Sequence, residues 1–258
     1  MAAPHQAENL KVLRALVEKP ALERSRDEIF VPLGHRLADA ALRGGIRRGA
    51  LHEVFAARAG EEASASGFAL ALAARVLAKG KWLLWVRQDF SALESGEVHG
   101  AGLMEFGIDP SRVLMLRAPD ATASLRAGAE GLDCRGLGAV IVEPWGEPKV
   151  FDLTASRRLT LAAQQHGVTA IVLRFGAEPD PSAAETRWLV KAAPSPPDDE
   201  DWGRPLFDAA LVRNRHGQAG RWIMEWDCDN GIFQTHSGAL AAAFADRSAE
   251  TPLVRQAG

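Results

Sequence analysis

Three short runs of apolar residues constrain the fold of this chain more than any other feature. They cover residues 83–86, 139–142 and 170–173, and none of them contains a polar side chain. A strand that faces water on one side alternates polar and apolar residues, whereas a strand covered by helices on both faces is apolar throughout. Segments of helical length separate the runs, and this alternation is typical of a parallel sheet. We therefore predict an α/β fold with a mainly parallel sheet flanked by helices.

The remaining elements before residue 174 follow the same alternation. Asp120 is placed to cap the start of one helix, and Gly167 is placed to end another. With 258 residues, 47% of them hydrophobic, the chain can bury the core of one large domain. The pattern predicts strands at residues 51–56, 82–86, 113–116, 139–142 and 169–173, and helices at 37–42, 68–77, 101–106, 120–132 and 152–166.

From Trp188 onward, consecutive strands replace the alternation of strands and helices. Strands are predicted at residues 188–192, 207–212 and 221–226, and a turn-rich segment between the last two is typical of a hairpin. We therefore predict a C-terminal antiparallel hairpin extension of the sheet. The predicted organisation is an N-terminal helix and linker over residues 1–30, a core over 31–228 that includes these strands, and a flexible tail over 229–258.

A strand, a loop and a helix at residues 50–77 have the arrangement of a Walker A phosphate-binding loop. Gly60 and Gly67 fall in the predicted loop. A working motif places Lys and then Ser or Thr after the second glycine, where they contact the phosphates and Mg²⁺. Here those positions hold Phe68 and Ala69. The sequence therefore predicts a nucleotide site without the side chains that bind phosphate and Mg²⁺.

Two acidic residues in the same loop support this interpretation. Glu61 and Glu62 add negative charge where a triphosphate would lie. Glu143 ends an apolar strand in the position of the Walker B carboxylate, and it is either a remnant Mg²⁺ ligand or a hydrogen-bonded structural acid. We predict no catalytic residue, no cofactor and no metal site. The expected remnant of the pocket consists of Gly60, Ser64, Ser66, Gly67 and Glu143.

Charge and hydropathy narrow the class of protein further. The formal net charge is −3, which gives no overall electrostatic basis for nucleic-acid binding. The sequence has no run of eighteen apolar residues and no secretory leader, so we expect a cytoplasmic protein without membrane contact.

Five stretches of the chain carry a family resemblance: residues 49–53, 84–88, 152–159, 184–188 and 220–226. They resemble the ImuA family, whose members are RecA-like proteins of bacterial SOS mutagenesis cassettes. The likeness runs from about residue 30 to residue 228, and the segments before the phosphate loop and the Walker B strand also resemble RecA recombinases. SulA division inhibitors are a related family.

This resemblance implies an adaptor without ATPase activity. Its expected partners are an inactive Y-family-like polymerase subunit, ImuB, and RecA, with an error-prone polymerase engaged indirectly. Two alternatives stay open: a SulA-like inhibitor of the tubulin-like division protein, and a nucleotide-dependent ATPase with an unorthodox loop. Recombinases hold DNA with two loops, which correspond here to residues 144–151 and 175–186. Lys149 is the only Lys or Arg in these two loops. Weak or no direct DNA binding is therefore expected.

The C-terminal hairpin supplies the candidates for partner binding. Arg213 and Arg215 form a modest basic cluster, and Trp222 and Trp226 lie on one face of the same strand because they are an even number of residues apart. Trp and Arg are enriched among residues that dominate binding at interfaces. The competing interpretation is that both tryptophans pack inside the core.

Overall fold

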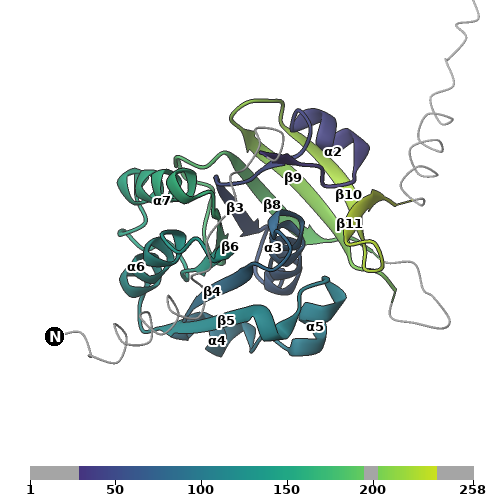
Figure 1. Ribbon diagram of the computed structural model, residues 1–258. Helices are drawn as coiled ribbons and strands as arrows, with labels where there is room; N and C mark the ends of the chain where they lie inside the picture. Colours follow the sequence, from purple (N-terminus) through teal and green to yellow (C-terminus); the bar gives the residue numbers. More distant parts are fainter. Residues whose placement is uncertain (1–28, 195–202, 237–258) are drawn as a thin grey trace, which may run out of the picture.

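A nine-stranded, mostly parallel sheet forms the centre of the computed structural model, which describes residues 29–194 and 203–236 (Figure 1). The strands lie in the order β11-β10-β9-β8-β3-β7-β6-β4-β5. Their bounds are β3 Leu51–Ala56, β4 Trp82–Gln88, β5 Val113–Ala118, β6 Leu137–Glu143, β7 Thr169–Arg174, β8 Thr186–Ala192, β9 Leu206–Asn214, β10 Gly220–Asp227 and β11 Ile232–Thr235. Strands β8, β3, β7, β6, β4 and β5 run parallel to one another, and β9, β10 and β11 continue the sheet from β8 in antiparallel pairs.

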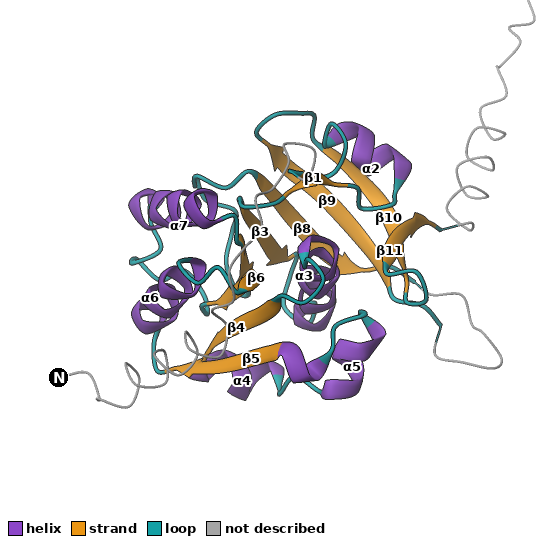
Figure 2. Ribbon diagram, viewed as in Figure 1, coloured by secondary structure: helices purple, strands orange, loops and turns teal. Residues whose placement is uncertain are grey.

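Helices cover both faces of the parallel strands (Figure 2). On one face, α6 and α7 pack over a core that includes Leu51, Val140 and Val172; on the other face, α3 packs over a core that includes Val54 and Ile141. The remaining helices lie at the edges, with α2 against β10 and α4 against β4. Helix bounds are α2 Arg36–Ala41, α3 Glu62–Val76, α4 Asp89–Ser95, α5 Gly100–Glu105, α6 Ala121–Leu132 and α7 Leu153–His166; a 3-10 turn spans Pro110–Arg112, and β1 Phe30–Val31 pairs with β2 Ile46–Arg47.

The predicted α/β class and the antiparallel extension are confirmed. Both predicted helix signals also hold: the Asp120 side chain accepts a hydrogen bond from the Ala123 amide at the start of α6, and Gly167 ends α7 with a left-handed φ of 67°. The alternating apolar pattern located these elements because each buries a long face.

Several short elements were missed. The sequence pattern gave no helix at α4, no strand at β1, β2 or β11, and no 3-10 turn at Pro110–Arg112. Strand β11 pairs with β10 and places Phe233 fully inside the core, so the predicted end of the core at Cys228 falls too early. The predicted N-terminal helix and the tail beyond His236 lie outside the described residues.

Aromatic packing joins the antiparallel strands to α3. The Phe68 ring lies 5.2 Å from the centres of both Trp188 and Phe233, and 5.6 Å from the ring of Phe207. Aromatic pairs at these separations stabilise a core beyond the area they bury. Phe68 is therefore a central core residue.

Within the described residues, no helix is long and apolar enough to cross a membrane.

Candidate functional site

The predicted phosphate loop is largely helical. Helix α3 begins at Glu62 instead of Phe68, which leaves only a short turn after β3. Gly60 lies in this turn with a φ of 88°, a conformation that favours glycine, but Gly67 lies inside the helix. The expected loop between the two glycines is therefore wrong. The segment 62–66 alternates Ala with Glu and Ser, and the burial of Ala65 favours helix over an open loop.

Gly67 serves packing. A Cβ atom at this position would lie 3.1 Å from the Phe106 ring and 3.4 Å from the Phe207 ring. Both distances are at or below ordinary van der Waals contact, so a side chain here would displace an aromatic ring. The glycine lets α3 approach α5 and β9 closely, and its backbone is not arranged to hold a phosphate.

Glu61 uses its carboxylate to bind another part of the chain. One oxygen accepts a hydrogen bond from the Ala192 amide at 2.7 Å, and the other forms an ion pair with Arg58 at 3.1 Å. Ser64 donates a weaker hydrogen bond of 3.4 Å to the same carboxylate. The Ala192 amide is the largest cause that lowers the pKa of Glu61. An acid therefore joins the start of α3 to the end of β8.

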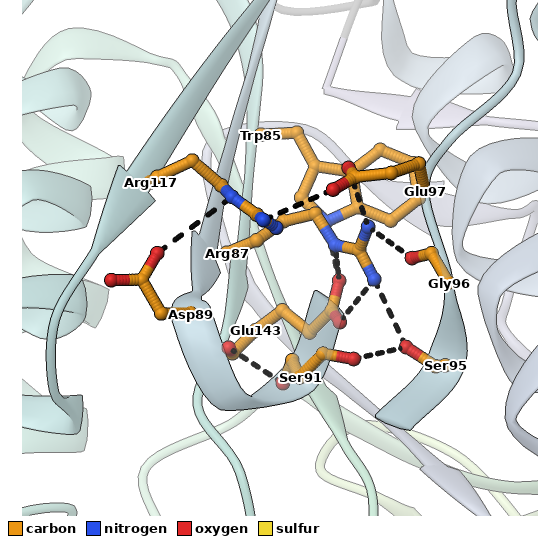
Figure 3. Close-up of polar contacts among 9 residues, drawn as sticks. All are labelled: Trp85, Arg87, Asp89, Ser91, Ser95, Gly96, Glu97, Arg117 and Glu143. Atoms are coloured by element: carbon orange, nitrogen blue, oxygen red, sulfur yellow. Dashed lines mark hydrogen bonds and ion pairs between the residues drawn. The ribbon is translucent and has the colours of Figure 1, made fainter. Parts of the chain in front are cut away.

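Glu143 lies beneath α3 at the carboxyl end of β6, fully buried (Figure 3). Its two oxygens accept hydrogen bonds from the Arg87 guanidinium at 2.9 and 3.0 Å, and one of them also accepts from the Trp85 indole at 2.8 Å. Arg87 and Glu143 are directly opposite each other in the pairing of β4 with β6. The carboxylate is thus neutralised and oriented by a neighbouring strand.

Arg87 connects this pair to the segment that follows α4. Its guanidinium donates to the Gly96 carbonyl at 2.8 Å and to the Ser95 hydroxyl at 3.0 Å, and it lies 3.8 Å from Glu97 (Figure 3). Arg117 on the edge strand β5 also contacts Glu97, at 3.0 Å. The segment 95–97 is therefore held over the carboxyl ends of β4 and β5, where open α/β sheets usually bind ligands.

A cavity of about 310 Å³ lies between α3, β4 and α5. It brings together two of the predicted pocket residues, Ser66 and Gly67, with Arg87 in its wall. Gly60, Ser64 and Glu143 do not line it. The five residues proposed from the sequence therefore do not form one pocket. Within the described part of the chain, no cluster of three His, Cys, Asp or Glu side chains could hold a metal ion.

A second buried polar network, between β3 and β8, was not recognised from the sequence. On one face of the sheet, Arg187 donates to Glu53 at 2.7 Å and to the Ser182 hydroxyl at 2.8 Å. Glu53 and Arg187 are register partners. Both lie in stretches that had been noted for their family resemblance, but only the strand order places the stretches side by side.

The opposite face of the same strand pair carries His52. Its Nδ1 lies 2.8 Å from the Thr186 hydroxyl, and its Nε2 lies 2.8 Å from the Arg47 carbonyl. Because a carbonyl can only accept, Nε2 carries the proton and Nδ1 accepts from Thr186. The Thr186 oxygen in turn accepts from the Trp188 indole at 3.1 Å. Burial is the main cause that lowers the pKa of His52 from 6.5 to about 4.

The loops at residues 144–151 and 175–186 are bound to each other. The Gly146 amide donates to the Phe175 carbonyl at 2.9 Å, and the Glu178 amide donates to the Glu147 carboxylate at 2.8 Å. Arg174, almost fully buried beneath them, donates to the Gly146 carbonyl and lies 4.8 Å from the centre of the Phe151 ring. Arg174 is therefore engaged inside the protein, and its burial lowers the pKa of its guanidinium.

The four partner-binding candidates occupy different environments. Trp226 is fully buried, with Phe233 at 5.1 Å, so it is a core residue and its proposed place at a partner surface is wrong. Trp222 is partly buried, and Arg213 is half-buried on β9 opposite Arg187. Arg215 is exposed in the hairpin turn. Alternation put both tryptophans on one face, but it could not show how β11 covers one end of that face.

Comparison with known proteins identifies similar chains in one bacterial species. Protein ImuA of Caulobacter vibrioides, from strain NA1000 / CB15N and from strain ATCC 19089 / CIP 103742 / CB 15, is in each case 31% identical over 197 residues. The matched region covers 70% of this chain and 77% of each relative. A comparison with models of protein families finds no match.

The Arg87–Glu143 pair predicts a strongly non-additive stability cycle. We expect Arg87→Met to lower the free energy of unfolding by about 3–5 kcal/mol, because it leaves the Glu143 carboxylate buried without its cation. The double variant Arg87→Met/Glu143→Leu is expected to recover most of this loss, since no buried charge remains. Urea denaturation of the wild type, both single variants and the double variant measures the coupling. Additive losses would contradict the assignment of a buried ion pair.

His52 predicts acid sensitivity between pH 6.5 and 4. The folded chain holds the ring neutral to a pKa of about 4, whereas the unfolded chain takes up a proton near 6.5. Stability that is fully present above pH 6.5 is therefore lost as the pH falls through this window, by about 3 kcal/mol for this group. Denaturation at stepped pH should show a smaller loss in His52→Gln than in wild type. Exposed His99→Gln is the matched control, and an unchanged pH dependence in His52→Gln would refute the assignment.

Proposed function

The chain belongs to the ImuA family, and on that premise we propose that it is a non-catalytic adaptor in damage-induced, error-prone DNA synthesis. The proposed partners are an ImuB-like polymerase subunit that has lost its own catalysis and RecA, with an error-prone polymerase engaged through them. A RecA-like origin of the fold and a cytoplasmic location are parts of the same proposal. The sequence stretches that resemble ImuA and RecA proteins support it.

The internal use of Glu143 is the observation that carries the non-catalytic part. Phosphoryl transfer depends on cations and Mg²⁺ that are positioned around the phosphates. Here both Glu143 oxygens accept hydrogen bonds from within the chain, and Phe68 occupies the position of the phosphate-binding lysine. Glu61, at the start of α3, adds a negative charge where a helix would otherwise attract an anion. These features favour protein contacts over nucleotide chemistry as the function.

The first test addresses nucleotide chemistry. We expect calorimetric titration with ATP and Mg²⁺ to give no binding heat, and a phosphate-release assay to give no turnover above buffer. A working P-loop ATPase in the same buffer is the positive control. Micromolar affinity together with steady phosphate release would overturn the non-catalytic proposal.

The second test addresses the adaptor role. Loss of the whole protein should abolish damage-induced mutagenesis while survival of undamaged cells is unchanged. Deletion of residues 237–258 tests the proposed contribution of the tail and leaves β11, with its core residue Phe233, in place. We expect this deletion to preserve the unfolding midpoint and to reduce both induced mutagenesis and co-purification of the ImuB-like subunit. Full retention of both would exclude a role for the tail.

A further inference from the structure

A groove of about 860 Å³ lies on the surface between α2 and the turn that joins β9 to β10. In Figure 1 this turn lies beside α2, away from the edge at which α4 and α5 lie. None of the residues that line the groove lies within residues 50–77, so the groove is separate from the predicted phosphate loop. Its lining residues include Leu37, Arg43, Arg215, Gly217 and Trp222.

The two walls of the groove are fixed to each other. The Asn214 side chain donates to the Ala41 carbonyl at the end of α2, at 2.9 Å. Gly217 lies so close to this carbonyl that a Cβ atom there would clash with it. The Asn214 side-chain oxygen also accepts from the His216 amide at 3.3 Å. The groove is therefore formed before any partner arrives, which lowers the entropic cost of binding.

Two large apolar side chains, Leu37 and Trp222, lie among the polar residues that line the groove. Leu37 leaves 51% of its surface exposed, which is a large fraction for a leucine beside a fixed groove. Trp222 lies partly buried, with its ring 6.2 Å from that of Trp188 and 6.3 Å from that of His35. Its six-membered ring also lies against Gly220. An incoming apolar side chain would thus meet Leu37 and the accessible part of a rigidly held indole.

The rim carries uncompensated positive charge. Arg43 and Arg215 are exposed, and within the described residues neither side chain has an ion pair or hydrogen bond. His216, also at the rim, lies 3.2 Å from Glu185, which Arg47 also approaches, at 3.8 Å. None of the described residues that line the groove is an acid. Two guanidinium groups without a partner among the described residues, beside Leu37 and Trp222, favour a ligand that is both acidic and apolar.

We propose that this groove docks an acidic segment of a partner protein, with a large apolar side chain seated between Leu37 and Trp222 and carboxylates paired with Arg43 and Arg215. The inference rests on the proposed adaptor function and assigns it a surface. A nucleic acid fits less well, because two cations neutralise only two phosphates and because neighbouring groups cover much of the Trp222 ring.

The test uses a fluorescein-labelled peptide that combines aspartates with leucines, titrated with the full chain and followed by anisotropy. Two control peptides replace the aspartates by lysine or the leucines by serine. Arg43→Glu/Arg215→Glu is the groove variant, and Arg157→Glu/Arg158→Glu, on the exposed side of α7, is the matched control with the same change in charge. Leu37→Ser tests the apolar contact. Thermal unfolding of every variant establishes that it folds.

We expect the acidic peptide alone to bind, with affinity lowered at least about tenfold by the groove variant and about twofold or less by the control variant. Equal losses in the two variants would overturn the proposal, because they would indicate long-range attraction. If single-stranded oligothymidylate binds more tightly than the peptide, and does so through Arg43 and Arg215, the occupant of the groove is a nucleic acid and the proposal is overturned. Tighter peptide binding after deletion of residues 237–258 would identify the tail of this chain as the occupant and would also overturn it.

Co-purification with the ImuB-like subunit separates this inference from the function on which it rests. If the wild type binds the subunit and the groove variant does not, both the groove inference and the adaptor function stand. If both proteins bind it equally, the groove is excluded as the site for that partner while the adaptor function stands. If the wild type itself does not bind, the proposed function fails, and the peptide titration still decides whether the groove binds acidic segments.

Discussion

Buried charge pairs across neighbouring strands are the constraint on which the rest of this structure depends. A parallel sheet covered on both faces cannot hold an unpaired ion, because removal from water costs several kcal/mol per charge. Glu53 with Arg187 meets this requirement on the α7 side, and Arg87 with Glu143 meets it on the α3 side. Each pair consists of direct register partners. A slip of one residue in either strand pair would leave two buried charges unpaired, so the ion pairs favour the same register as the buried apolar side chains.

The Arg87–Glu143 pair also determines what the carboxyl end of β6 can do. An acid at the end of a buried strand can hold a metal ion only if its oxygens are available. Here Arg87 engages both oxygens of Glu143 and also holds the segment around Ser95 and Gly96 over the strand ends. On the α3 side, Phe68 and Gly67 fit α3 closely against aromatic rings. Ion pairing and aromatic packing thus make this region part of the protein interior.

The surface away from those strand ends has a different character. Binding at the α2 groove needs no movement of the sheet, because Asn214 and Gly217 already hold its two walls together. Its exposed leucine, and its arginines that have no ion pair among the described residues, contrast with the loops after β6 and β7, whose polar groups bond to one another.

The sequence by itself determined the α/β class and the helix caps. These follow from local properties: the period of apolar residues and the capping ability of Asp120. Tertiary structure alone decided which strands are neighbours, and hence that Arg87 meets Glu143 and that His52 meets Thr186. It also decided that Gly67 belongs to a helix and that Trp226 is core while Trp222 borders a groove. The physical reason is that these outcomes depend on contacts between residues far apart in the chain, such as the pairing of β11 over Trp226, which no local pattern encodes.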